Sequence, residues 1–162
     1  MLIRIATSRD WPHIWRIIEP IVRAGTTYAI EPTITEADAC TLWMSAPRQT
    51  YVVEQGEDIL GTYYIKDNQA GPGSHVCNCG YMVCERAAGK GIATQLCEHS
   101  QHEALSLGYR AMQFNFVAAS NEGAVYLWRK LGFDLVGTLP GAFCHPTLGD
   151  VDAYVFFKTL GD

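Results

Sequence analysis

The sequence lacks the long apolar segments of a membrane protein. No stretch of its 162 residues approaches the ~18 consecutive apolar residues of a transmembrane helix, and the opening MLIRIATSRDW has no apolar run long enough for a signal peptide. Basic residues are also not in excess, because 12 Lys and Arg against 17 Asp and Glu give a formal net charge of −5. We therefore expect a cytoplasmic protein that does not bind membranes, and the missing basic excess argues against a nucleic-acid partner.

Charged residues are few, at 18%, whereas 48% of the residues are hydrophobic. A chain of this length and composition can bury an ordinary core, so we predict one domain over residues 1–162. The six cysteines include Cys77 and Cys79 in a C-x-C pattern. Residues two apart on a strand lie about 6.6 Å from each other, which is awkward for a tetrahedral zinc site. We expect packed, reduced thiols and no metal.

Hydrophobic periodicity predicts an α/β protein. Alternating or short apolar runs predict strands at 2–6, 50–55, 59–66, 75–84, 111–118, 133–139 and 151–160. Apolar residues at helical spacing predict helices at 11–22, 35–44, 91–107 and 121–131. This order of elements is typical of a mixed sheet covered by helices.

The stretch CERAAGKGIAT (residues 84–94) places glycines and basic residues between a predicted strand and a predicted helix. Gly89 and Gly91 let the backbone approach an anion, and Arg86 and Lys90 add positive charge. The free N–H groups at a helix start suit a phosphate, so the stretch is a candidate pyrophosphate cradle. It is not a P-loop, because Lys90 is not followed by Ser or Thr, and it lacks the third glycine of a dinucleotide fingerprint. A glycine-rich helix start without a ligand is the alternative.

The segment RAAGKGIA (residues 86–93) resembles the Arg/Gln-x-x-Gly-x-Gly/Ala signature of the GNAT (GCN5-related) N-acetyltransferases. About thirty residues later, NEGAVYLWRKLGF (residues 121–133) resembles the second motif of that family. The order of elements agrees over nearly the whole chain. The resemblance implies the GNAT (acyl-CoA N-acyltransferase) fold, a mixed, mostly antiparallel sheet with splayed central strands in the order β-α-α-β-β-β-α-β-α-β-β. It also implies acetyl-CoA as acetyl donor, an amine as acceptor and, as in many members, a homodimer.

The same resemblance implies which residues hold acetyl-CoA. The backbone beside the motif would pair with the pantetheine arm, and the N–H groups that follow would hold the pyrophosphate. The expected residues are Met82, Val83, Arg86, Ala87, Ala88, Gly89, Lys90, Gly91, Ile92, Ala93, Asn121 and Trp128.

Trp128 stands where many family members carry a tyrosine that protonates the leaving thiolate. Tyr126 is two residues earlier, about 200° around the helix, so it is expected to face elsewhere. The indole N–H of Trp128 cannot act as an acid at neutral pH. We therefore hypothesise that thiolate protonation comes from water or is dispensable.

Two asparagines, Asn78 and Asn115, lie in the strands that would flank the splayed gap. Their amides either reach the acceptor or complete backbone hydrogen bonds. HVCNCGYMV, FNFVAASN and the tryptophan of AVYLW resemble a group of yeast acetyltransferases that act on proline-analogue imino acids, in which matching asparagines are implicated in holding the substrate. GTTYAIEPTITEAD (residues 25–38) resembles the substrate loop of phosphinothricin-type acetyltransferases, in which Glu31 would face a cationic amine.

The sequence thus predicts an acetyl-CoA-dependent N-acetyltransferase that acts on a small-molecule amine, an amino acid or an analogue. The amine would attack the thioester directly in a ternary complex, with a backbone N–H near Met82 or Val83 polarising the carbonyl. Asn78, Asn115 and Glu31 are the candidate catalytic and acceptor-binding residues. Two alternatives stay open: acetylation of protein or peptide N-termini, and a non-catalytic acetyl-CoA sensor.

Overall fold

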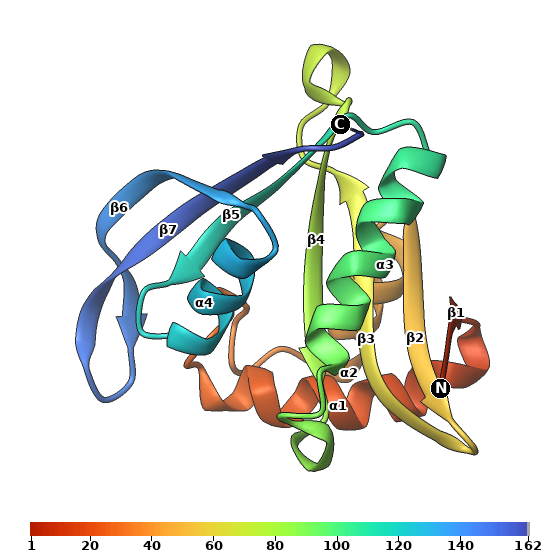
Figure 1. The fold of residues 1–162 in the computed structure, drawn as a ribbon. Coiled ribbons are helices and arrows are strands. Elements are labelled where there is room, and N and C mark those ends of the chain that lie inside the picture. The colour runs from red at the N-terminus through yellow and green to blue at the C-terminus, as the bar shows by residue number, and fades with distance from the viewer. Residues whose placement is uncertain (162) are drawn as a thin grey trace.

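A seven-stranded sheet forms the centre of the computed structural model, which describes residues 1–161 (Figure 1). Its order in space is β1-β2-β3-β4-β5-β7-β6. All neighbouring strands are antiparallel except β4 and β5, which are parallel. The strands are β1 (Leu2–Ile5), β2 (Gln49–Gln55), β3 (Asp58–Asp67), β4 (Val76–Val83), β5 (Ala111–Ala118), β6 (Asp134–His145) and β7 (Gly149–Thr159).

Helices cover both faces of this sheet. One face packs against α3 (Ile92–Ser106) and the other against α1 (Trp11–Ala24), so the core has two layers of apolar side chains (Figure 1). The remaining helices are α2 (Glu36–Cys40) and α4 (Glu122–Lys130). The predicted order of strands and helices and the mixed, mostly antiparallel sheet are confirmed. Within residues 1–161, no helix has the length and apolar character needed to cross a membrane.

The parallel strands β4 and β5 separate soon after they meet. They pair only at Val76 with Ala111 and at Cys77 with Met112, and beyond this point they diverge (Figure 1). The pairing of β5 with β7 shifts register between Phe114 and Val117, which marks an irregularity in this part of β5. From Asn78 onward, β4 therefore presents one edge without a strand partner.

Two elements differ from the sequence-based expectation. The predicted strand 133–139 continues to His145, although most side chains of β6 are exposed. The Nδ1 atom of His145 accepts the N–H groups of Thr147 and Leu148, both at 3.2 Å, so this histidine closes the β6–β7 turn. The predicted helix 35–44 is split into α2 and a π-helical turn over Thr41–Ser45.

Candidate active site

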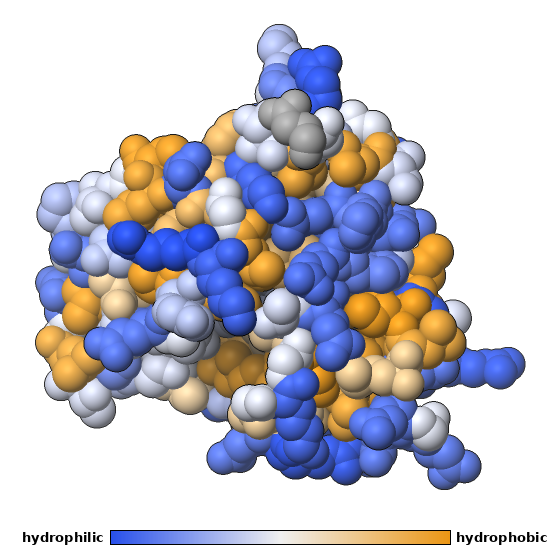
Figure 2. Space-filling model, viewed as in Figure 1, coloured by the Kyte–Doolittle hydropathy of each residue, from blue (hydrophilic) through white to orange (hydrophobic). Residues whose placement is uncertain are grey.

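A cavity of about 890 Å³ lies where β4 and β5 diverge. Its walls come from β3, β4, β5, the start of α3, α4 and the loop that includes Thr27 to Ile30. Figure 2 shows a hollow with hydrophobic atoms at its floor between the α4 region and the start of α3. The cavity therefore joins the predicted pyrophosphate cradle to the predicted acceptor residues.

The open edge of β4 supplies backbone hydrogen-bonding groups to this cavity. The Tyr81 N–H donates to the Tyr28 hydroxyl at 2.9 Å, and that hydroxyl donates to the Tyr81 carbonyl. On the opposite side, the Cys84 N–H donates to the Leu60 carbonyl of β3 at 2.9 Å. Because backbone groups alternate along a strand, those of Tyr81 and Val83 point into the gap. Those of Met82 point toward β3. The backbone groups that face the gap are therefore those of Tyr81 and Val83, whereas the resemblance implied Met82 and Val83.

The start of α3 presents bare backbone, as the glycine pattern predicted. Gly89 and Gly91 have φ values of 74° and 75°, in the left-handed region that glycine adopts without strain. Nothing lies within 4 Å of where a Cβ on either residue would be. The N–H groups of residues 91–94 have no acceptor among the described residues. Such a helix start is suited to an anion.

The side chains around this helix start point into different surroundings. Ala87 and Ile92 pack into the core, whereas Ala88 and Ala93 line the cavity. The Arg86 guanidinium lies 2.8 Å from the Asp58 carboxylate, with both side chains exposed.

Lys90 is exposed in the same turn. The Arg86 side chain is directed toward the β2–β3 turn in this structure, so the free polar groups at the helix start itself are backbone N–H groups.

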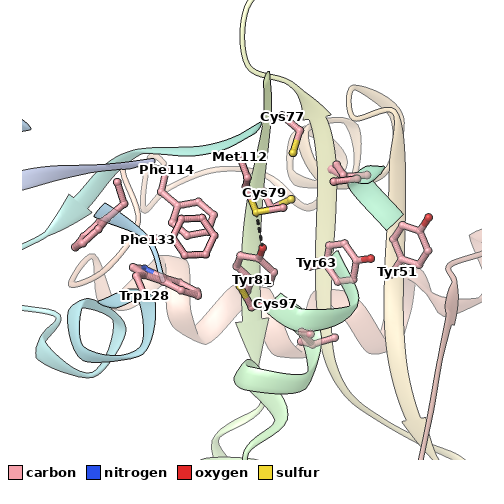
Figure 3. Close-up of a cluster of buried hydrophobic side chains, with 14 of the residues drawn as sticks. Tyr51, Tyr63, Cys77, Cys79, Tyr81, Cys97, Met112, Phe114, Trp128 and Phe133 are labelled. Carbon is pink, nitrogen blue, oxygen red and sulfur yellow. Dashed lines mark hydrogen bonds between the residues drawn. The ribbon is translucent and has the colours of Figure 1, made fainter. Parts of the chain in front are cut away.

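The start and middle of α4 bring two predicted residues to the cavity. The Asn121 side chain accepts the Ala124 N–H at 3.3 Å and so caps the helix. Trp128 is 8% exposed, with its ring centroid 4.6 Å from that of Phe114 and 5.4 Å from that of Tyr81 (Figure 3).

Tyr126 is 68% exposed and does not line the cavity. Its predicted orientation away from the site is confirmed. Trp128 instead packs among the aromatic rings that fill one side of the splayed strands (Figure 3).

The predicted acceptor residues Asn78 and Asn115 both line the cavity. The Asn78 amide nitrogen donates to the Gln113 carbonyl at 3.0 Å, and its oxygen accepts the Tyr64 hydroxyl at 3.3 Å. The Asn115 amide nitrogen donates to Asn68 at 2.7 Å. Asn78 therefore completes a backbone hydrogen bond between β4 and β5, as the second interpretation of these amides expected, while its oxygen side faces Tyr64.

Glu31 is not brought into the site. It is exposed, accepts the Thr33 hydroxyl at 3.3 Å and lines no part of the cavity. The preceding Ala29 and Ile30 do line it. The position of Glu31 therefore does not support its expected role as a charge partner.

The sequence analysis missed Tyr28 and Lys66, which both line the cavity. Alternation along the strand would have placed Lys66 on the same face as Tyr64. No local pattern points to Tyr28, because its partner Tyr81 is 53 residues away. Burial raises the pKa of Tyr28, so the hydroxyl stays protonated and serves as a donor.

The cysteines near the cavity are packed thiols. Cys79 lines the cavity and is 5% exposed, and burial raises its pKa well above the usual value. All six cysteines are free. Among residues 1–161, no three or more His, Cys, Asp or Glu side chains come together as a metal site. Cys79 is therefore held in its protonated form, which is a poor nucleophile.

Comparisons with known proteins agree with this geometry. The acetyltransferase (GNAT) family model matches residues 11–133. The N-acetyltransferase aca1 of Schizosaccharomyces pombe is 33% identical, over 87% of this chain and 77% of the relative. A GCN5-related N-acetyltransferase from Kribbella flavida is 41% identical with a TM-score of 0.93, over 98% of this chain and 97% of that chain.

A phosphinothricin acetyltransferase from Sinorhizobium meliloti, solved in complex with AcCoA, has the same fold. It is 20% identical with a TM-score of 0.86, over 99% of this chain and 88% of that chain. The family match and the close relatives confirm the resemblance inferred from the two motifs. The chain belongs to the GNAT family of N-acetyltransferases.

Proposed function

We propose that this enzyme transfers the acetyl group of acetyl-CoA to the amine of a small molecule, an amino acid or a close analogue. The observation that carries the proposal is that one cavity is lined by the open β4 edge and by Ala88 and Ala93 at the start of α3, where the backbone N–H groups are free. The N–H groups of residues 91–94 would hold the pyrophosphate. The backbone of Tyr81 and Val83 would pair with the amides of the pantetheine arm, as an added strand does. The phosphinothricin acetyltransferase of the same fold, solved in complex with AcCoA, supports acetyl-CoA as the donor.

The chemistry follows from the groups at the open edge. The neutral acceptor amine attacks the thioester carbon, and its nitrogen, positively charged after the attack, loses one proton to water. The C–S bond breaks, and the thiolate leaves and takes up a proton from water or from a nearby hydroxyl that water reprotonates. A backbone N–H of Tyr81 or Val83 would stabilise the negative charge on the carbonyl oxygen. Since burial keeps Cys79 protonated, direct attack is favoured over an acyl-enzyme.

The acceptor would enter at the Asn78 and Asn115 end of the cavity. These amides offer hydrogen bonds, and Tyr28, Ala29 and Ile30 of the loop line the same cavity. A concave cavity of about 890 Å³ has the size of a small-molecule site. We place the enzyme in the cytoplasm, where its free thiols would remain reduced.

Release of free CoA, read by mass spectrometry, tests the proposal. The acceptor panel should contain proline analogues, phosphinothricin, methionine sulfone, polyamines, aminoglycosides and short peptides. We expect turnover confined to amino and imino acids, and a lower rate in the Asn115→Ala variant. Turnover of peptides alone would instead indicate N-terminal acetylation. Acetyl-CoA binding with no turnover would indicate a sensor.

A further inference from the structure

Lys66 is the one charged residue among the described residues that line the cavity. The other lining residues are apolar or carry hydroxyl, thiol or amide groups, and no Asp or Glu is among them. This single positive charge contrasts with the formal net charge of −5 of the whole chain. The cavity is therefore positively charged although the chain as a whole carries a net negative charge.

The position of Lys66 is set by three residues on β3 and β4. Lys66 pairs with Asn78 across the two strands, so both side chains share one face of the sheet. The Lys66 ammonium lies 5.3 Å from the centroid of the Tyr64 ring. Tyr64 in turn fits because its neighbour is Gly80: a Cβ there would lie 2.6 Å from Tyr64 Cε1. The ammonium therefore lies by the Tyr64 ring, and that ring packs on Gly80 of β4.

The ammonium has no partner of opposite charge within residues 1–161. No carboxylate lies within 4.0 Å of it, and it makes no hydrogen bond there; its one polar contact is with the Tyr64 ring. Lys66 is half-buried in a mostly apolar wall. An ammonium without a partner of opposite charge in such a wall attracts an anion that enters the cavity.

We infer that Lys66 binds the carboxylate, or an equivalent anionic group, of the acceptor. In an α-amino or imino acid the amine is separated from the carboxylate by one carbon. A carboxylate on Lys66 would then leave the amine beside Asn78, facing the Tyr81 edge. Polyamines and aminoglycosides would bring a second cation against Lys66 and be disfavoured, and a peptide N-terminus would offer an uncharged amide instead. This inference rests on the proposed function and specifies its substrate class.

The test compares an acceptor amino acid, such as proline, with its uncharged carboxamide. Rates would be measured for the wild type and for Lys66→Met, Lys66→Arg and the exposed control Lys130→Met. We expect the wild type to prefer the carboxylate about 10- to 100-fold in kcat/KM, and Lys66→Met to lose most of that preference through KM. Lys66→Arg should retain part of it, and Lys130→Met all of it.

An equal loss on both acceptors in Lys66→Met, or a wild type without preference, would overturn the role of Lys66 and leave the proposed function standing. Turnover of peptides alone, or of no acceptor, would overturn the proposed function and this inference together. The melting temperature and the acetyl-CoA Kd of each variant show whether the fold and the donor site are intact. They should match the wild type, because Lys66 lies outside the predicted cradle.

Discussion

Tyr28 satisfies the backbone of Tyr81 at the point where β4 has lost its strand partner. One phenol replaces both hydrogen bonds that a neighbouring strand would otherwise supply. A pantetheine amide on the same groups would have to displace it. In the proposed complex, the Tyr28 hydroxyl and the donor would therefore compete for the backbone groups of Tyr81.

The Tyr28→Phe variant measures this competition. Loss of the hydroxyl should lower the free energy of unfolding of the empty protein by about 1–2 kcal/mol, because two buried backbone groups lose their partner. Acetyl-CoA should bind about 3- to 10-fold more tightly, since it no longer displaces the phenol. Chemical denaturation and calorimetric titration give the two values.

Tyr126→Phe is the matched control, since Tyr126 is 68% exposed and neither value should change. Weaker acetyl-CoA binding in Tyr28→Phe would contradict this account. It would mean that the hydroxyl contacts the bound donor.

Some residues of the candidate site could be identified from the sequence, and others could not. Gly89 and Gly91 were found because a helix start has a local pattern. Asn78 and Asn115 were found because amides are unusual in core strands. Lys66 was missed because a single lysine in a strand is ordinary in a sequence, and its place in a cavity depends on where β4 and the loop lie.

At the scale of elements, the start of α3 and its end offer a controlled comparison. Gly91 and Gly108 flank this helix with φ values of 75° and 89°, and nothing lies within 4 Å of a Cβ on either. Replacement by alanine should lower the free energy of unfolding by about 1–2 kcal/mol at both positions, because left-handed backbone disfavours a side chain.

Only Gly91→Ala should also weaken acetyl-CoA binding, by about tenfold, because its Cβ would obstruct the approach of the pyrophosphate. Titration calorimetry of both variants gives the Kd values. Equal Kd values for Gly91→Ala and Gly108→Ala would rule out this helix start as the pyrophosphate site.

Element boundaries were predictable where capping signals exist and not elsewhere. Gly25 and Gly108 end α1 and α3 with left-handed backbone, as the sequence indicated. The extension of β6 to His145 was missed because Pro140 and Gly141 interrupt the strand pattern. Proline is compatible with an edge strand, whose N–H groups need no partner, and β6 is an edge strand.

At the scale of the whole molecule, an ion pair fastens β1 to the start of α1. Arg4 donates two hydrogen bonds to the Asp10 carboxylate, at 2.8 and 2.9 Å, and Asp10 also accepts the Thr7 N–H at 2.7 Å. The hydrogen bonds from Arg4 hold the pKa of Asp10 well below its usual value, against the opposing effect of burial. This contact therefore favours the fold whenever Asp10 is ionised.

The pH dependence of the free energy of unfolding follows from the lowered pKa of Asp10. The folded pKa of Asp10 is lower than its unfolded value of about 4, so its stabilisation is complete above pH 4 and is lost as the pH falls toward the folded pKa. Asp10→Asn should be less stable than the wild type by about 1–3 kcal/mol at pH 7. The difference should shrink as the pH falls below about 4.

Denaturant unfolding at a series of pH values measures this difference. The exposed Asp134→Asn change is the control and should show no such trend. A constant difference between Asp10→Asn and the wild type from pH 7 to pH 2 would show that the Asp10 carboxylate is not stabilised by its charge.

Assembly of the site is the least predictable property of the molecule. The two halves of the cavity were identified from separate motifs, yet their meeting depends on the divergence of β4 and β5 and on the path of the loop with Tyr28. Contacts such as that between Tyr28 and Tyr81 span 53 residues and have no local pattern. The sequence therefore predicted the family, which the comparisons confirm, and a candidate donor cradle, and the structure added Tyr28 and Lys66 to the residues of the cavity.

The most direct test of the central claim follows a labelled acetyl group through one turnover. The enzyme would be mixed with isotopically labelled acetyl-CoA and an amino-acid acceptor, and both small molecules and intact protein would be weighed by mass spectrometry. We predict that the label appears only on the amine of the acceptor, with free CoA released in equal amount and the protein mass unchanged. Label retained on the protein would contradict direct attack, and the absence of labelled acceptor from every amino and imino acid tested would contradict the proposed function.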